Sequence, residues 1–111
     1  MNTKNISKID TVFLYGSYTE IETYYCKQIL NNQNIKIDVI NIALNPDQEK
    51  EILDHIKTWR FEVDGKTVNP EKLPFVKWRV TDGEYVYMEY ATNSQELANS
   101  NLILFKDKIN G

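Results

Sequence analysis

Apolar and polar residues are arranged near the start of the chain as two short strands separated by a helix. Residues 11–16 and 35–40 are the apolar runs, and the segment between them, residues 17–31, has helical spacing of its apolar positions. Two strands separated by a helix pair in parallel in a βαβ unit. Ile21, Tyr25 and Ile29 fall on one stripe of this helix, which we expect to be its buried face.

Helix starts are indicated at three places by a short polar side chain that can accept a hydrogen bond from the N–H groups of a first turn. The second helix has Pro46 at its first position, where the missing donor costs nothing. Its predicted apolar stripe consists of Ile52, Ile56 and Trp59 with Leu53, and the third helix, residues 94–104, has Leu97, Ala98 and Leu102 as its apolar set. The predicted caps are Thr19 with Glu22, Asn45 with Gln48, and Asn93 with Glu96.

A hairpin is predicted between the second and third helices. Residues 75–80 and 84–90 flank Thr81-Asp82-Gly83, and Asp-Gly supplies the positive φ that tight hairpin turns require. Residues 61–72, which contain Asp64-Gly65, form an insertion that is either a small hairpin or a loop. The element order is therefore β-α-β-α-β-β-α, which predicts an α/β fold with a four-stranded mixed sheet flanked by helices.

Length and charge restrict the class of protein. The 111 residues fit one domain, predicted at residues 11–105, with a partly disordered segment at 1–10 and a C-terminal tail at 106–111. A net charge of -3 without a Lys/Arg cluster argues against nucleic acid, and no apolar run is long enough for a bilayer, so we expect no membrane association. The single cysteine, Cys26, forms no internal disulfide, which fits a cytoplasmic location.

Two groups of residues resemble the thioredoxin fold in its glutaredoxin-like form. They are the strand Phe13-Leu14-Tyr15 followed by a helix carrying Tyr25-Cys26-Lys27-x-x-Leu30, and the Leu73-Pro74-Phe75-Val76 segment that opens the hairpin. The resemblance implies that the Leu73–Pro74 bond is cis and that it faces the start of the first helix across a shallow groove. It also implies that the backbone of Leu73 binds an extended peptide. The residues of this implied binding groove are Tyr18, Thr19, Glu20, Leu73 and Pro74.

The chain departs from this family where the family has its chemistry. The Cys-x-x-Cys pair of the family falls on residues 20–23, Glu-Ile-Glu-Thr, and a carboxylate cannot carry out thiol–disulfide exchange. The Gly-Gly and Asp residues that hold glutathione are also missing, since residues 90–93 read Tyr-Ala-Thr-Asn. We therefore expect no cofactor. Residues 38–42 followed by Asn45-Pro46 are similar to the cysteine-free thioredoxin-like proteins of the KaiB type, which implies a protein-interaction role.

Several residues have both a structural and a chemical interpretation. Cys26 is either a packed, inert thiol or the nucleophile of a thiol- or glutathione-dependent transferase. His55 is either a residue of a solvated face or a ligand or base, but it has no partners at metal-site spacing, so no metal is predicted. Glu20 and Glu22 are either acids of a first helical turn or candidates for a general base.

Aromatic residues suggest an interaction surface. Core packing explains most of them, yet exposed tyrosines are typical contact residues because they bury much area at small entropic cost. The candidates are Tyr18, Trp78, Tyr85 and Tyr87. The strand carrying Tyr85 is expected at a sheet edge, where it could pair in a homodimer. The sequence thus predicts a redox-inactive module that binds a protein or an extended peptide, with a Cys26-dependent enzyme as the alternative.

Overall fold

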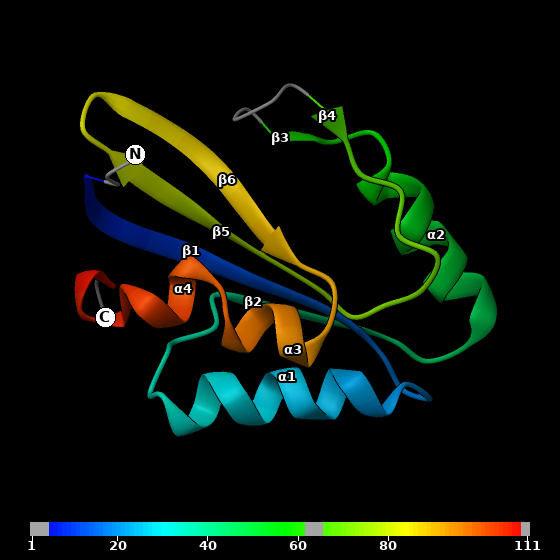
Figure 1. Ribbon diagram of the computed structural model, residues 1–111. Coiled ribbons are helices and arrows are strands. Elements are labelled where there is room, and N and C mark those ends of the chain that lie inside the picture. Colours follow the sequence, from blue (N-terminus) through cyan, green and yellow to red (C-terminus); the bar gives the residue numbers. More distant parts are fainter. Residues whose placement is uncertain (1–4, 62–65, 110–111) are drawn as a thin grey trace.

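The computed structural model describes residues 5–61 and 66–109. A central sheet is flanked by helices, and a two-stranded ribbon follows α2 (Figure 1). The strands of the sheet are β1 (Ile6–Ser17), β2 (Val39–Ala43), β5 (Phe75–Asp82) and β6 (Tyr85–Ala91), and the ribbon consists of β3 (Arg60–Phe61) and β4 (Lys66–Thr67). The helices are α1 (Ile21–Asn32), α2 (Pro46–Ile56), α3 (Ser94–Ala98) and α4 (Asn101–Leu104), followed by the 3-10 turn η1 (Lys106–Lys108).

The strand order in the sheet is β2-β1-β5-β6. β1 pairs in parallel with β2, with Phe13 opposite Val39, and antiparallel with β5, which forms the predicted hairpin with β6. Gly83 has a φ of 62° at the hairpin turn, which is the positive φ that the Asp-Gly pair predicts. The four-stranded mixed sheet, its flanking helices and the order β-α-β-α-β-β-α are therefore as predicted.

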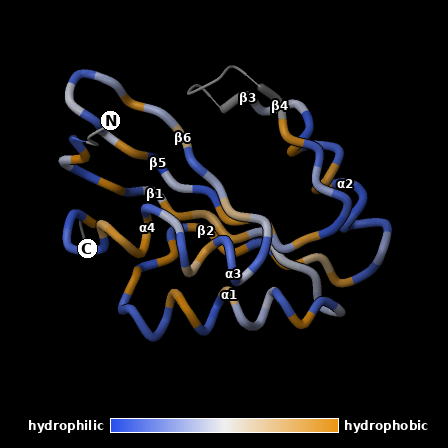
Figure 2. Tube along the Cα trace, in the orientation of Figure 1, coloured by the Kyte–Doolittle hydropathy of each residue, from blue (hydrophilic) through white to orange (hydrophobic). Residues whose placement is uncertain are grey.

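The sheet has a hydrophobic core on each face. α1, α3 and α4 cover one face and α2 lies on the other (Figure 1). Adjacent residues of β5 divide between the cores, because Val76 packs on the α1 side and Phe75 on the α2 side. Figure 2 shows hydrophobic residues along the central strands. Ile52, Leu53 and Ile56 of α2 pack in the second core as predicted. Trp59 packs there too, but it lies beyond the end of α2 at Ile56.

The domain begins earlier and ends later than predicted. β1 starts at Ile6 rather than at Thr11, because Ile6 and Ile9 are buried and pair with β5. Residues 6–10 are therefore strand rather than partly disordered. The polar residues among them do not indicate a strand. A register shift between Asp10 and Phe13 also interrupts the alternation of buried and exposed side chains along β1. In the predicted tail, η1 is ordered and Ile109 bridges to Ile9.

α1 buries a different face from the one predicted. The buried side chains are Thr23, Cys26 and Leu30, whereas Ile21 and Tyr25 are 60% and 46% exposed. Ile29, the third residue of the predicted stripe, is partly buried against the core on the α1 side. Several stripes of α1 carry apolar residues, so helical spacing alone did not decide which one packs on the sheet. The correction matters for the site, because it leaves large apolar side chains exposed at the beginning of α1.

Two of the three predicted caps are formed. Asn45 Oδ1 accepts from Gln48 N–H at 2.9 Å, and Asn93 Oδ1 accepts from Glu96 N–H at 2.8 Å. The predicted third helix is divided into α3 and α4, and Ala98 is exposed while Leu97 and Leu102 are buried. β3 and β4 pair antiparallel, which agrees with the hairpin alternative for the insertion, and the predicted turn at Asp64-Gly65 lies outside the described residues.

Candidate functional site

The start of α1 packs tightly against the end of β1. Ser17 N–H donates to Thr23 Oγ1 at 2.9 Å, and a Cβ on Gly16 would overlap the Thr23 methyl group. The predicted cap of Thr19 with Glu22 is wrong, because the N-cap residue is Glu20 and Glu22 turns to α3. Glu22 Oε1 accepts from Ser94 N–H at 2.7 Å, and hydrogen bonds from the side chain and the backbone of Ser94 lower the pKa of Glu22. Thr23 and Glu22 thus join three elements at the site.

The implied groove brings together the two segments that the sequence placed there. Glu20 Oε2 lies 3.8 Å from Lys72 Nζ, so the first turn of α1 is beside the segment that precedes β5. The Leu73–Pro74 bond is cis, as the resemblance implied. Tyr18 and Thr19 are exposed at the edge of this region, whereas Leu73 and Pro74 are buried.

The backbone of Leu73 is already engaged within the chain. Its N–H donates to Glu49 Oε2 of α2 at 3.0 Å. An extended peptide that added as a strand at Leu73 would have to displace this carboxylate from the N–H group. The N–H that the resemblance assigns to a peptide ligand therefore has an acceptor within the chain, and local sequence does not indicate this bond because Glu49 and Leu73 are 24 residues apart.

Cys26 is on the buried face of α1 with an exposed fraction of 0%. Burial, together with the neighbouring charge of Glu22, raises the pKa of the thiol to about 12. A nucleophilic cysteine needs an accessible thiolate, and this environment disfavours the thiolate. The side chain packs as a small apolar residue in the core beside Leu30.

Aromatic and apolar side chains surround the beginning of α1 on its solvent side. Tyr18 is 75% exposed, and Ile21, Tyr24 and Tyr25 are exposed on the first turns of the helix. The rings of Tyr24 and Tyr25 are 6.0 Å apart in an edge-on arrangement. We call Tyr18, Ile21, Tyr24 and Tyr25 the α1 surface.

The candidates on the hairpin have different surroundings. Tyr85 is 75% exposed, but Trp78 is buried and donates from Nε1 to Glu89 Oε1 at 3.1 Å, so Trp78 cannot be a contact residue. Tyr87 is partly buried and donates to Asp82 Oδ2 at 3.3 Å. Burial, with the nearby Glu89 and Asp82 carboxylates, raises the pKa of Tyr87 to about 12. Trp78 lies on the face of β5 that packs in the core on the α1 side, together with Val76.

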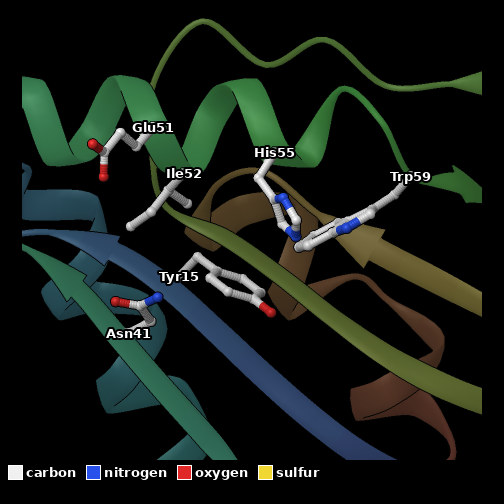
Figure 3. A pocket seen from close by; sticks show the side chains of 6 residues that line it. All are labelled: Tyr15, Asn41, Glu51, Ile52, His55 and Trp59. Carbon is white, nitrogen blue, oxygen red and sulfur yellow. The ribbon is translucent and has the colours of Figure 1, made fainter.

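A pocket that the sequence did not predict lies between α2 and the sheet. Figure 3 shows side chains of the sheet and of α2 directed toward one another around it. Its volume is about 240 Å³, which is below the range of roughly 300–1,000 Å³ typical of small-molecule sites. His55, expected on a solvated face, is exposed, but its ring lies 5.4 Å from that of Trp59. The lining residues are Tyr15, Asn41, Glu51, Ile52, His55 and Trp59.

Lys77 occupies the aromatic cluster next to this pocket. Its Nζ lies 3.7 Å from the centre of the Trp59 ring and 4.9 Å from that of Phe13. Burial lowers the pKa of Lys77, whereas the ring faces attract its charged form. The ring faces of this cluster therefore bind a cation of the chain itself, so we interpret the cluster as part of the packing between α2 and the sheet.

No group of three or more His, Cys, Asp or Glu side chains suited to a metal ion occurs in residues 5–61 and 66–109. Over the same residues, no helix has the length and apolar character needed to cross a bilayer. Comparison with protein families, with curated proteins and with solved structures gave no match. The function must therefore be inferred from the geometry alone.

Proposed function

We propose that this protein is a redox-inactive thioredoxin-like module that binds another protein or an extended peptide through the α1 surface. The observation that carries the proposal is the exposure of Tyr18, Ile21, Tyr24 and Tyr25 at the beginning of α1. Clustered aromatic side chains provide contact area at small entropic cost. The position is the one at which the sequence places Glu20 instead of a reactive cysteine.

The environment of Leu73 bears on how a partner would bind. Because Glu49 accepts the Leu73 N–H, contact through side chains is favoured over addition of a strand at this point. Glu20 and Lys72 supply one charge of each sign beside the aromatic residues, at 3.8 Å from one another. A partner with an apolar centre and a polar rim would fit this surface.

The enzyme alternative has no supporting observation. A transferase that used Cys26 would need an exposed thiol of lowered pKa, and Cys26 is buried with a raised pKa. The proposal also includes a cytoplasmic location, which the single unpaired cysteine supports.

The test compares two tyrosines of equal exposure. Tyr18 and Tyr85 are both 75% exposed, but Tyr18 belongs to the α1 surface and Tyr85 to β6. Protein carrying Tyr18→Ala is expected to lose at least about tenfold in affinity for the partner captured by the original chain, and Tyr85→Ala is expected to retain it. Capture that is unchanged by Tyr18→Ala, or is lost with Tyr85→Ala instead, would overturn the proposal.

A further inference from the structure

The edge strand β2 directs the backbone groups of two residues away from the sheet. β2 is the first strand in the order β2-β1-β5-β6 and pairs with β1 alone among the described strands. Tyr18 N–H donates to Ala43 O at 2.8 Å, so Ala43, and Asn41 two residues earlier, direct their backbone groups toward β1. Successive residues of a strand alternate in this direction, so the N–H and C=O groups of Ile40 and Ile42 point outward.

The outward side of β2 has no protection of the kind that sheet edges usually have. Residues 39–44 contain neither a charged residue nor a proline, and Ile40 is 47% exposed. Natural proteins use charge, proline or coverage to prevent an edge strand from pairing with another chain. An edge without these features is suited to an extended peptide that adds as a further strand.

The pocket between α2 and the sheet reaches this edge. Asn41 lines the pocket, and Ala43 packs in the core on the α2 side, so the odd-numbered residues of β2 direct their side chains toward α2. Asn41 and Glu51 lie at one end of the pocket, and Trp59 lies at the other (Figure 3). Because Asn41 belongs to the edge strand, its end of the pocket is the end beside the outward groups of β2.

The size and lining of the pocket suit one aromatic side chain. Its volume of about 240 Å³ is too small for a drug-sized molecule and fits a single large side chain. Ile52 and the rings of Tyr15 and Trp59 supply apolar walls, and the exposed Glu51 places a carboxylate at the rim. A ring that enters from the edge packs against these walls and leaves its backbone beside β2.

The charges around β2 favour a basic partner. Every charged residue between positions 37 and 49 is acidic, and the whole chain has a net charge of -3. Lys50, a basic residue of α2, lines the groove on the other side of that helix. Complementary charge accelerates association and selects the partner, so basic residues beside the aromatic one fit this edge.

We infer that β2 binds an extended segment of another protein as a fifth, antiparallel strand, with one aromatic side chain of that segment in the pocket and basic residues beside it. The residues of the segment opposite Ile40 and Ile42 each exchange two hydrogen bonds with them. The residue between these two lies opposite Asn41, with its Cβ about 4.5–5.5 Å from Asn41 Cβ, and directs its side chain toward α2. This residue enters the pocket.

A second copy of β2 would fill the pocket poorly. The residues that β2 directs toward α2 are Val39, Asn41 and Ala43, and none of them has a ring. An unrelated segment is therefore favoured over self-pairing. The site is also distinct from the α1 surface, because it is formed by β2, α2 and the rings beside them.

The probe is the peptide acetyl-Lys-Val-Tyr-Val-Lys-amide, whose tyrosine and lysines share one face of a strand and whose valines share the other. It is expected to bind the original chain with a dissociation constant below about 1 mM in an NMR titration. Hydrogen exchange of the Ile40 and Ile42 amides is expected to slow in the complex. The same peptide with alanine in place of tyrosine is expected to bind at least about tenfold more weakly, because the pocket is then empty.

Methylation of peptide amides tests the pairing, with a matched control. Methylation of both valine nitrogens removes the donors opposite Ile40 and Ile42 and is expected to weaken binding at least about tenfold. The tyrosine N–H points away from β2, so its methylation is expected to leave binding nearly unchanged. Sensitivity to tyrosine methylation and not to valine methylation would overturn the antiparallel pairing.

Charge variants of α2 test the rim of the pocket. Glu51→Lys is expected to weaken peptide binding at least about threefold. Asp54→Lys is the control, because Asp54 is an exposed acid of the same helix that lines the groove on its other side, and it is expected to keep the affinity. Equal losses in the two variants would overturn the contact with the pocket.

Two results would overturn the inference as a whole. One is the absence of peptide binding at about 1 mM, including the case in which the original chain sediments as a dimer that Ile40→Pro dissociates, which would assign the edge to a second copy. The other is loss of peptide binding with Tyr18→Ala, which would place the peptide on the α1 surface. Unchanged peptide binding by Tyr18→Ala is the expected result, so this test and that of the α1 surface are independent.

Discussion

The backbone N–H of Leu73 donates to Glu49 Oε2 at 3.0 Å, which ties the segment before β5 to α2. Leu73 is buried at 0% exposure, so without the Glu49 carboxylate its N–H group would lose this hydrogen-bond acceptor in the protein interior. The contact joins the cis Leu73–Pro74 peptide to the helix on the second face of the sheet. It also occupies a backbone group that a strand-like ligand would use.

Removal of the Glu49 carboxylate is expected to destabilise the protein. Glu49→Ala should cost about 1–3 kcal/mol in the free energy of unfolding, because the Leu73 N–H is left buried without this acceptor. Glu49→Gln keeps an acceptor oxygen and should cost less. Urea denaturation measures both, and Glu51→Ala, an exposed glutamate of the same helix, serves as the control. Equal effects of Glu49→Ala and Glu51→Ala would mean that the bond contributes nothing.

Cys26 is expected to react with thiol reagents only when the protein unfolds. A pKa of about 12 in place of 9.0 lowers the thiolate fraction about a thousandfold near neutral pH, and burial adds a barrier to access. Labelling kinetics followed by mass spectrometry, in native buffer and in denaturant, measure the difference. Thr19→Cys in a Cys26→Ala background provides an exposed thiol for comparison. Rapid labelling of Cys26 in the native protein would contradict its buried position.

Gly16 is expected to tolerate no side chain. A Cβ there would overlap the Thr23 methyl group, so Gly16→Ala should destabilise the protein by about 1–3 kcal/mol. Thr23→Ser removes that methyl group and keeps the hydroxyl that accepts from Ser17 N–H. The double variant should therefore lose less unfolding free energy than the two single variants lose in sum. A double-mutant cycle measures this difference. Strict additivity would argue against the contact.

Acid is expected to weaken the link between α1 and α3. Hydrogen bonds from the side chain and the backbone of Ser94 lower the pKa of Glu22 from its usual 4.5, so the unfolded chain binds this proton more readily than the folded protein. The stabilisation is therefore present above about pH 4.5 and is lost as the pH falls through the lower folded pKa. Glu22→Gln should flatten the pH dependence of the unfolding free energy below pH 4.5, by less than about 1 kcal/mol. An unchanged slope would count against this contribution.

Thr11 is expected to be replaceable by glycine with a gain in stability. Its φ of 57° lies in the left-handed region, which is unfavourable for a β-branched residue. Thr11→Gly should raise the unfolding free energy by about 1 kcal/mol, since glycine adopts this conformation without strain. Thr11→Ala retains a Cβ and is the control. A larger gain from alanine than from glycine would show that the backbone is not the cause.

Local patterns of sequence determined most of the elements and their order. The Asn45 and Asn93 caps, the Asp82-Gly83 turn and the α2 stripe involve groups a few residues apart, and their geometry follows from the backbone of a single element. The α/β class and the mixed sheet follow from the same patterns. The start of β1 was not predicted because three of its residues 6–10 are polar and Ile6 and Ile9 do not alternate with them at a period of two.

Tertiary structure decided which groups meet. Helical spacing on α1 allowed Ile21 and Tyr25 to be buried, and only the packing of the helix on β1 through Thr23, Cys26 and Leu30 left the α1 surface exposed. The bond from Leu73 to Glu49 and the pocket below α2 join residues that are distant in the chain. Such contacts depend on the relative placement of whole elements, a quantity that short-range periodicity does not contain.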